Sequence, residues 1–238
     1  MELVKTLWTA EDKKDFLDYL KSFSNTQKID WARRILNTQL DLLCLPTKKV
    51  HEIANYIYKG NYTSFLDLNI FDNYESIAIY GMIISKINDF DLMITYMKHY
   101  MDVMENWAHV DLLSLHNIND SYKNHYLALS STCLKDSRIF VRRLGLMILF
   151  QMIDDPSVLI IIFDALLFLE DEDAYYVIMM AGWLLSEAII KYKDKTLMFL
   201  SKHPNLNKKI VNKGIQKCRE SRRLSQDEKD FLLSFKRK

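Results

Sequence analysis

The scarcity of turn-forming residues constrains this chain most. Its 238 residues include only 5 Gly and 3 Pro. A β-sandwich or an α/β fold has many tight turns, and tight turns draw mainly on these residue types. Apolar residues make up 49% of the chain and charged residues 26%, which is typical of a globular protein and not of a disordered one. We therefore expect an all-helical protein.

Apolar residues recur at helical spacing in many short segments joined by polar links. The segments expected to be helical are 12–23, 26–43, 48–58, 63–68, 73–86, 90–104, one helix around Trp107, 121–133, 137–152, 157–169, 173–192, 194–202, 207–220 and 226–236. Helix caps are expected at Thr47, Asp120 and Asp136. Buried positions are expected at Ile77, Ile79, Tyr80, Ile83 and Ile84.

The spacing of these helices favours a repeat architecture. Helix pairs recur about every 35 to 40 residues, which is typical of HEAT-like arrays and not of a four-helix bundle. The sequence therefore predicts an all-α, HEAT-like helical repeat array, a curved α-solenoid with a concave groove. No linker is long enough to divide it, so residues 1–238 are expected to form a single domain.

Cysteine usage and hydropathy indicate the compartment. Cys44, Cys133 and Cys218 form no CxxC pair and are expected to be reduced core thiols. The first residues lack the pattern of a signal peptide. The most apolar run, 158–169, is short and contains Asp164, which suits a buried helix better than a membrane span. We expect a cytoplasmic protein with no membrane partner.

Charge is unevenly distributed although the net charge is only +1. Residues 201–238 hold 12 Lys and Arg against 4 Asp and Glu, whereas residues 101–200 hold 8 against 14. A basic patch near the C-terminus could bind phosphates, or it could simply be the solvated face of a final helix pair.

Several common chemistries lack their motifs here. No glycine-rich phosphate loop is present, so a nucleotide cofactor is not expected. The pair His51-Glu52 lacks the second histidine of a zinc protease because position 55 is Asn. The acidic run 170–173 is interpreted as a solvated loop that caps the next helix. We expect no metal and no cofactor.

One constellation could carry chemistry. Trp107 and Asp111 are four residues apart, which places both on one face of a helix. Arg143 follows Trp107 by 36 residues, and Trp183 follows Arg143 by 40. In a repeat array such offsets could bring all four residues to one surface. The alternatives are that both tryptophans belong to the core and that Asp111 pairs with a neighbouring lysine.

The stretch Trp107-Ala108-His109-Val110-Asp111 resembles the W-x-x-V-D motif of the AlkD-like DNA alkylation repair glycosylases. Two further stretches resemble motifs of the same family in the same order, namely 140–146, which carries Arg143, and 181–187, which carries Gly182 and Trp183. The resemblance spans residues 12 to 220.

The resemblance implies a HEAT-like fold that holds duplex DNA with alkylated bases and removes N3- or N7-alkylated purines, without full flipping of the base. It implies that Asp111 stabilises the cationic sugar, that Trp107 and Trp183 cradle it, and that Arg143 holds a phosphate. Further DNA contacts are expected at Arg138, Arg142, Lys208 and Lys209. A monomer without a cofactor is expected.

The sequence departs from the family pattern at three positions. Ile35 stands where the family has a tyrosine, and Met179 and Ser186 replace a lysine and an arginine. Lost cations remove phosphate contacts, which dominate affinity for DNA. The alternative hypothesis is therefore a catalytically inactive relative that binds DNA structures or a protein partner as a HEAT-like scaffold.

Overall fold

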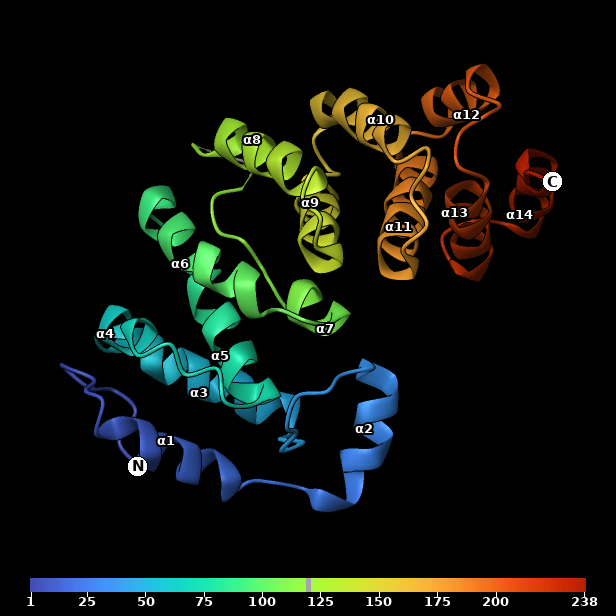
Figure 1. The fold of residues 1–238 in the computed structure, drawn as a ribbon. Coiled ribbons are helices and arrows are strands. Elements are labelled where there is room, and N and C mark those ends of the chain that lie inside the picture. The colour runs from blue at the N-terminus through green and yellow to red at the C-terminus, as the bar shows by residue number, and fades with distance from the viewer. Residues whose placement is uncertain (119–120) are drawn as a thin grey trace. The chain divides into compact units, whose positions relative to one another are not determined.

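The computed structural model describes residues 1–118 and 121–238, and the regular elements in these ranges are all helices (Figure 1). Helices account for 67% of the chain, which confirms the all-α prediction. The expected cap Asp120 lies outside the described residues. The contacts divide the chain into two compact units, Met1–His116 and Asn117–Lys238, and the single domain over residues 1–238 stays a prediction.

The first unit contains seven α-helices and one short 3-10 helix. They are α1 (Asp12–Lys21), η1 (Thr26–Lys28), α2 (Ile29–Leu36), α3 (Thr47–Lys59), α4 (Tyr62–Asp67), α5 (Tyr74–Ile84), α6 (Phe90–Val103) and α7 (Trp107–Asp111).

Helix α5 forms the centre of the first unit and packs against α3, α6 and α7. Asn73 begins it with a capping box, in which its side chain accepts the N–H of Ser76 at 2.9 Å. The five positions predicted to be buried, Ile77, Ile79, Tyr80, Ile83 and Ile84, are all buried, so this part of the prediction is confirmed.

The prediction of one helix over residues 26–43 is wrong. Helix α2 ends at Leu36, and Asn37 adopts a left-handed conformation with φ of 51°. Asparagine tolerates this region better than most residues, so it can end a helix as glycine does. The buried Thr38 then donates its hydroxyl hydrogen to Glu105, which directs the chain away from the helix axis.

The described residues of the second unit form seven further α-helices. They are α8 (Lys123–Leu134), α9 (Ile139–Gln151), α10 (Leu159–Phe168), α11 (Tyr175–Lys191), α12 (Lys193–Lys202), α13 (Lys208–Glu220) and α14 (Gln226–Leu232), with the 3-10 helices η2 (Pro156–Val158) and η3 (Leu233–Phe235).

Helices α9, α11 and α13 form one layer of the second unit, and each packs on the next (Figure 1). Helices α8, α10 and α12 form the other layer. Helices α9, α11 and α13 begin at residues 139, 175 and 208, at intervals of 36 and 33 residues. The predicted helical repeat is therefore confirmed in this unit.

Two predicted caps are wrong in detail. Helix α9 begins at Ile139, and Asp136 accepts the N–H of Arg138 at 2.8 Å without capping the helix. Thr47 is the first residue of α3 and follows Pro46.

The three cysteines are free, and Cys133 and Cys218 are buried while Cys44 is half-buried. No helix among the described residues is both long and apolar enough to cross a bilayer.

A glycine lies at the contact between α8 and α9 of the second unit. A Cβ atom at Gly145 in α9 would lie 2.9 Å from the Ser130 carbonyl oxygen of α8. The neighbour is backbone and cannot move alone, so any side chain at position 145 separates the two helices.

We expect Gly145→Val to lower the free energy of unfolding by about 1–3 kcal/mol, because overpacking exceeds the gain in helix propensity. Urea unfolding followed by circular dichroism measures it. The control is Ser131→Val on the exposed side of α8, which should change stability by less than about 0.5 kcal/mol. A stable Gly145→Val protein would contradict this account of the α8–α9 contact.

Candidate functional site

A buried asparagine creates the short helix that carries Trp107 and Asp111. The side-chain oxygen of Asn106 accepts the N–H groups of Ala108 at 3.0 Å and His109 at 3.1 Å. These two bonds satisfy donors that the start of a helix leaves open. The resulting helix, α7, has five residues, so Trp107 and Asp111 stand one turn apart on one face, as predicted.

His109 fixes α7 to the core of the first unit. Its ring is buried and stacks on Tyr74, with the ring centroids 4.7 Å apart. One ring nitrogen lies 3.3 Å from the Tyr74 carbonyl oxygen and the other 3.3 Å from the Asn106 amide nitrogen. A neutral ring satisfies both neighbours by donating to the carbonyl and accepting from the amide. Burial lowers the pKa of His109 to about 4, so the ring is neutral near pH 7.

The indole of Trp107 is held from the other side by α2. Its Nε1–H donates to the carbonyl oxygen of Ile35 at 3.1 Å. The Ile35 side chain is 51% exposed, so this residue contributes its backbone and not a core side chain. Sequence reasoning treated Ile35 only as a departure from the family pattern and missed this contact. Asp111 is half-buried at the end of α7.

Arg143 and Trp183 lie in the second unit, on the neighbouring helices α9 and α11. Arg143 is only 5% exposed, and its guanidinium donates to the Tyr176 carbonyl oxygen at 2.6 Å. Trp183 is 37% exposed and lies against Phe150, with ring centroids 4.6 Å apart. Trp107 and Asp111 thus share one helix, whereas Arg143 and Trp183 belong to the other unit. That all four line one groove stays a prediction.

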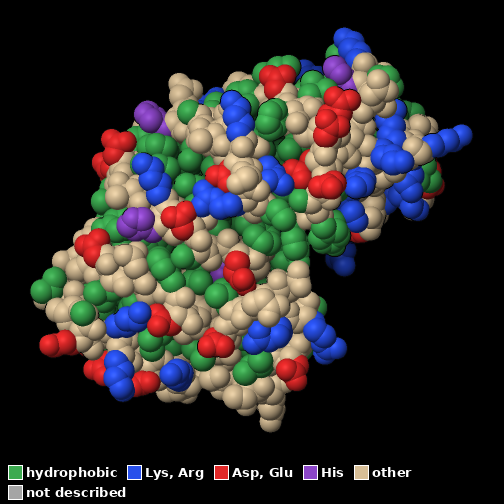
Figure 2. All heavy atoms as spheres, in the orientation of Figure 1, with side chains coloured by type: hydrophobic (Ala, Val, Ile, Leu, Met, Phe, Trp, Pro, Cys, Tyr) green, Lys and Arg blue, Asp and Glu red, His purple; other side chains and the backbone are tan. Residues whose placement is uncertain are grey.

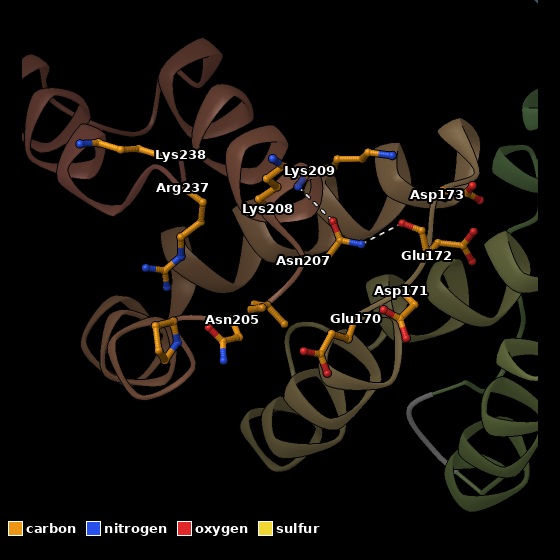
Figure 3. Close-up of a pocket in the computed structure, with 12 residues that line it drawn as sticks. Glu170, Asp171, Glu172, Asp173, Asn205, Asn207, Lys208, Lys209, Arg237 and Lys238 are labelled. Carbon is orange, nitrogen blue, oxygen red and sulfur yellow. Dashed lines mark hydrogen bonds between the residues drawn. The ribbon is translucent and has the colours of Figure 1, made fainter.

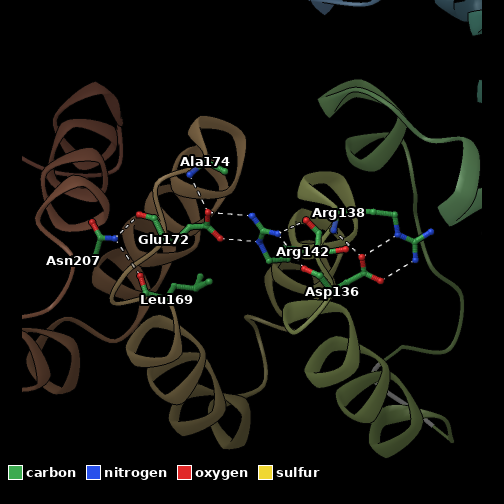
Figure 4. Close-up of polar contacts among 8 residues, drawn as sticks. Asp136, Arg138, Arg142, Leu169, Glu172, Ala174 and Asn207 are labelled. Atoms are coloured by element: carbon green, nitrogen blue, oxygen red, sulfur yellow. Dashed lines mark hydrogen bonds and ion pairs between the residues drawn. The ribbon is translucent and has the colours of Figure 1, made fainter.

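Two of the arginines expected to contact DNA are bound to carboxylates (Figure 4). Arg142 forms a forked pair with Glu172, at 2.8 and 3.2 Å, and also donates to the carbonyl oxygens of Asp136 and Ser137. Arg138 pairs with Asp136 at 2.8 and 2.9 Å, and these bonds lower the pKa of the Asp136 carboxyl to about 2. An arginine whose charge is paired with a carboxylate in this way attracts a phosphate group less strongly.

The two lysines expected to contact DNA begin α13. Lys208 and Lys209 line an opening of about 550 Å³ together with the acidic run 170–173 and the C-terminal Arg237 and Lys238 (Figure 3). Asn207 caps α13 by accepting the N–H of Lys209 at 3.0 Å, and its amide also donates to the carbonyl oxygens of Leu169 and Glu172. In the view of Figure 2, Lys and Arg side chains gather over α13 and α14.

The acidic run has a structural role within the second unit. Glu172 accepts the N–H of Ala174 at 2.9 Å, directly before α11, in addition to its pair with Arg142. Within the described residues, no group of three or more His, Cys, Asp or Glu is arranged to hold a metal ion.

Comparison with protein-family models places these residues in context. Residues 16–216 match the model described as DNA alkylation repair enzyme, and the chain belongs to this family. Searches of curated proteins and of solved structures gave no match. The family implies that the protein interacts with DNA in the repair of alkylation damage.

The buried His109 gives a prediction for stability against pH. Its pKa is about 4 in the folded protein and about 6.5 when unfolded, so between these values the unfolded chain binds more protons. We expect the free energy of unfolding to fall by roughly 3 kcal/mol as pH decreases through this window.

Urea unfolding at a series of pH values measures this effect. In His109→Gln the overall stability should be lower, but the part of the pH dependence between about 6.5 and 4 should disappear. An equally steep decline in the variant would show that other groups cause it.

Proposed function

We propose that this protein is a DNA glycosylase that hydrolyses the N-glycosidic bond of N3- or N7-alkylated purines in duplex DNA. The observation that supports it is the pairing of Trp107 and Asp111 on one rigid turn of helix in a member of the DNA alkylation repair family. In this proposal the protein acts as a monomer in the cytoplasm and uses no nucleotide or metal.

The chemistry suits a single carboxylate. Alkylation at N3 or N7 makes the purine cationic, so it leaves without protonation by a general acid. The bond from C1′ of the sugar to the base nitrogen breaks, and its electron pair goes to the base. Positive charge then develops on the sugar, where Asp111 stabilises it. Water forms the new C1′–O bond and gives its proton to Asp111 or to solvent.

The aromatic side chains complete this arrangement. An indole face carries negative potential and attracts a cation within about 6 Å. The Trp107 ring is fixed at its edge by the Ile35 carbonyl, so its orientation does not have to be set when the substrate binds. Trp183, the more exposed indole, is assigned the second contact with the sugar, and Arg143 a phosphate near the lesion.

Asp111→Asn should reduce base release by about 10²–10³-fold, because the amide keeps the shape but loses the charge that stabilises the sugar cation. The measurement is release of 7-methylguanine and 3-methyladenine from methylated duplex DNA under single-turnover conditions. Unfolding curves of both proteins serve as the control for folding. Release by the variant at the wild-type rate would contradict the role of Asp111.

A second candidate is a relative without glycosylase activity that binds DNA structures or a protein partner. The pairing of Arg142 with Glu172 and of Arg138 with Asp136 favours it, because both cations are neutralised within the unit. Met179 and Ser186 are also uncharged. Base release by the wild-type protein that depends on Asp111 would exclude this candidate.

The location of the phosphate contacts can be tested by salt dependence. We expect Lys208→Ala and Lys209→Ala each to weaken DNA binding and to reduce the slope of log affinity against log salt by about 1. Fluorescence anisotropy with a labelled duplex at several salt concentrations measures the slope.

Arg142→Gln is the matched comparison because its charge is already paired with Glu172. It should leave the slope unchanged and lower the free energy of unfolding by about 1.5–3 kcal/mol. A change of slope in Arg142→Gln equal to that in the lysine variants would place the DNA against α9 instead of the start of α13.

A further inference from the structure

A small basic pocket lies in the second unit, between α13 and the residues that follow η3. Its volume is about 260 Å³. Four cationic side chains line it, namely Lys209, Lys213, Arg219 and Lys236, together with the amides of Asn212 and Gln216. No Asp or Glu belongs to this lining among the described residues. The pocket is therefore a concave site with one sign of charge.

The positive charge of this pocket is not neutralised by its own lining. Among the residues that the structure describes, Lys209, Arg219 and Lys236 form no ion pair. Lys213 donates to the neutral Gln216 side chain at 2.8 Å. Cations held around one small space repel one another, so an anion between them removes this repulsion and adds attraction.

Glu220 is a carboxylate that is hydrogen-bonded to the lining. It accepts from the Gln216 amide at 2.9 Å, and it pairs with Lys217 at 2.8 Å. Lys217 does not line the pocket, so it balances the charge of Glu220 without using a cation of the lining. The four cations of the lining thus remain in excess.

The protein positions part of this lining before any ligand binds. Asn212 accepts the N–H of Arg237 and donates to its carbonyl oxygen, both at 2.9 Å, which fixes the backbone beside Lys236 along α13. The stem of Lys213 lies against α11, where a Cβ atom at Gly182 would be 2.5 Å from the Lys213 Cγ. Side chains that are already in place lose less conformational freedom when an anion binds.

We propose that this pocket binds a diphosphate group, either free pyrophosphate or the diphosphate of a nucleotide. Ammonium and guanidinium groups bind phosphate oxygens through charge-assisted hydrogen bonds. A backbone phosphodiester brings one negative charge, whereas a diphosphate brings roughly three near pH 7, which matches the four cations better. The site is separate from the attack on alkylated DNA, because it uses neither Asp111 nor a nucleic-acid strand.

The size and lining of the pocket indicate that it recognises the phosphates alone. Its volume of about 260 Å³ lies below the range of about 300–1,000 Å³ for sites that enclose a whole small molecule. Within the described part of the chain no aromatic side chain lines it, so a nucleotide base has no ring on which to stack. A nucleotide would therefore place its diphosphate in the pocket and leave its base in solvent.

Titration calorimetry of the full chain, at constant ionic strength and without divalent cations, tests the proposal. The probes are pyrophosphate, ADP and inorganic phosphate. We expect one pyrophosphate per chain, bound at least about tenfold more tightly than phosphate, and an ADP affinity within about threefold of that for pyrophosphate. Equal affinities for pyrophosphate and phosphate would overturn the proposal. Binding of ADP without binding of pyrophosphate would place recognition in the base and would also overturn it.

Variants locate the site. Lys236→Ala and Arg219→Gln should each weaken pyrophosphate binding at least about fivefold, and both residues are exposed, so folding should not change. Arg222→Gln is the matched control and should bind normally, because Arg222 is exposed, lies outside the lining and has no ion pair among the described residues. An equal loss in all three variants would show attraction by overall charge only. No loss in Lys236→Ala and Arg219→Gln would place the anion elsewhere, and either result overturns the proposal.

Binding to duplex DNA separates this pocket from a DNA contact. Lys209 is left out of the variants because it is also assigned to DNA. We expect Lys236→Ala and Arg219→Gln to keep the wild-type affinity for duplex within about threefold at physiological salt. If they weaken duplex binding but leave pyrophosphate binding intact, the pocket holds DNA phosphates and the proposal falls. If wild type binds pyrophosphate but releases no alkylated base, the proposed glycosylase falls and the diphosphate site stands.

Discussion

The candidate site depends on the hydrogen bonds of Asn106. A five-residue helix such as α7 is too short to be stable alone, because nucleation costs more than so few backbone bonds return. The side-chain oxygen of the buried Asn106 accepts two backbone N–H groups at the start of α7, and the neutral ring of His109 is buried beside it. The Tyr100 hydroxyl donates to the His109 carbonyl at 2.7 Å. The side chains of Trp107 and Asp111 thus belong to a turn that these buried hydrogen bonds hold from its inner side.

The second unit uses its arginines to join successive repeats. Arg143 in α9 donates to the Tyr176 carbonyl in α11, and Arg142 reaches Glu172 in the link before α11. Asn207 continues this pattern by bonding the same link from the start of α13. Guanidinium groups suit such ties because their donors are fixed in a plane. Arg142 and Arg143, which resemble DNA contacts in the family motif, therefore also connect neighbouring helices of the second unit.

The fold was largely predictable because its signals are local. Few glycines, apolar residues at helical spacing and polar links were sufficient to predict most of the helices and the burial of five apolar residues of α5. The end of α2 was not predictable, because apolar spacing continues through Leu40 and Leu43 while Thr38 bonds to Glu105, 67 residues away. Likewise, the sequence placed Trp107 and Asp111 on one face but could not show that Arg142 meets Glu172, 30 residues later. Contacts between segments that are distant in the sequence decide which Lys and Arg side chains are paired with carboxylates. The spacing of apolar residues carries no information about such contacts.

Trp107 connects helices α2 and α7 of the first unit. Its indole edge is bonded to α2, which has no residue in the core, while its backbone belongs to α7, which is fixed by buried contacts. The orientation of the Trp107 indole does not depend on which side chain stands at position 35, because the backbone carbonyl of Ile35 accepts its hydrogen bond.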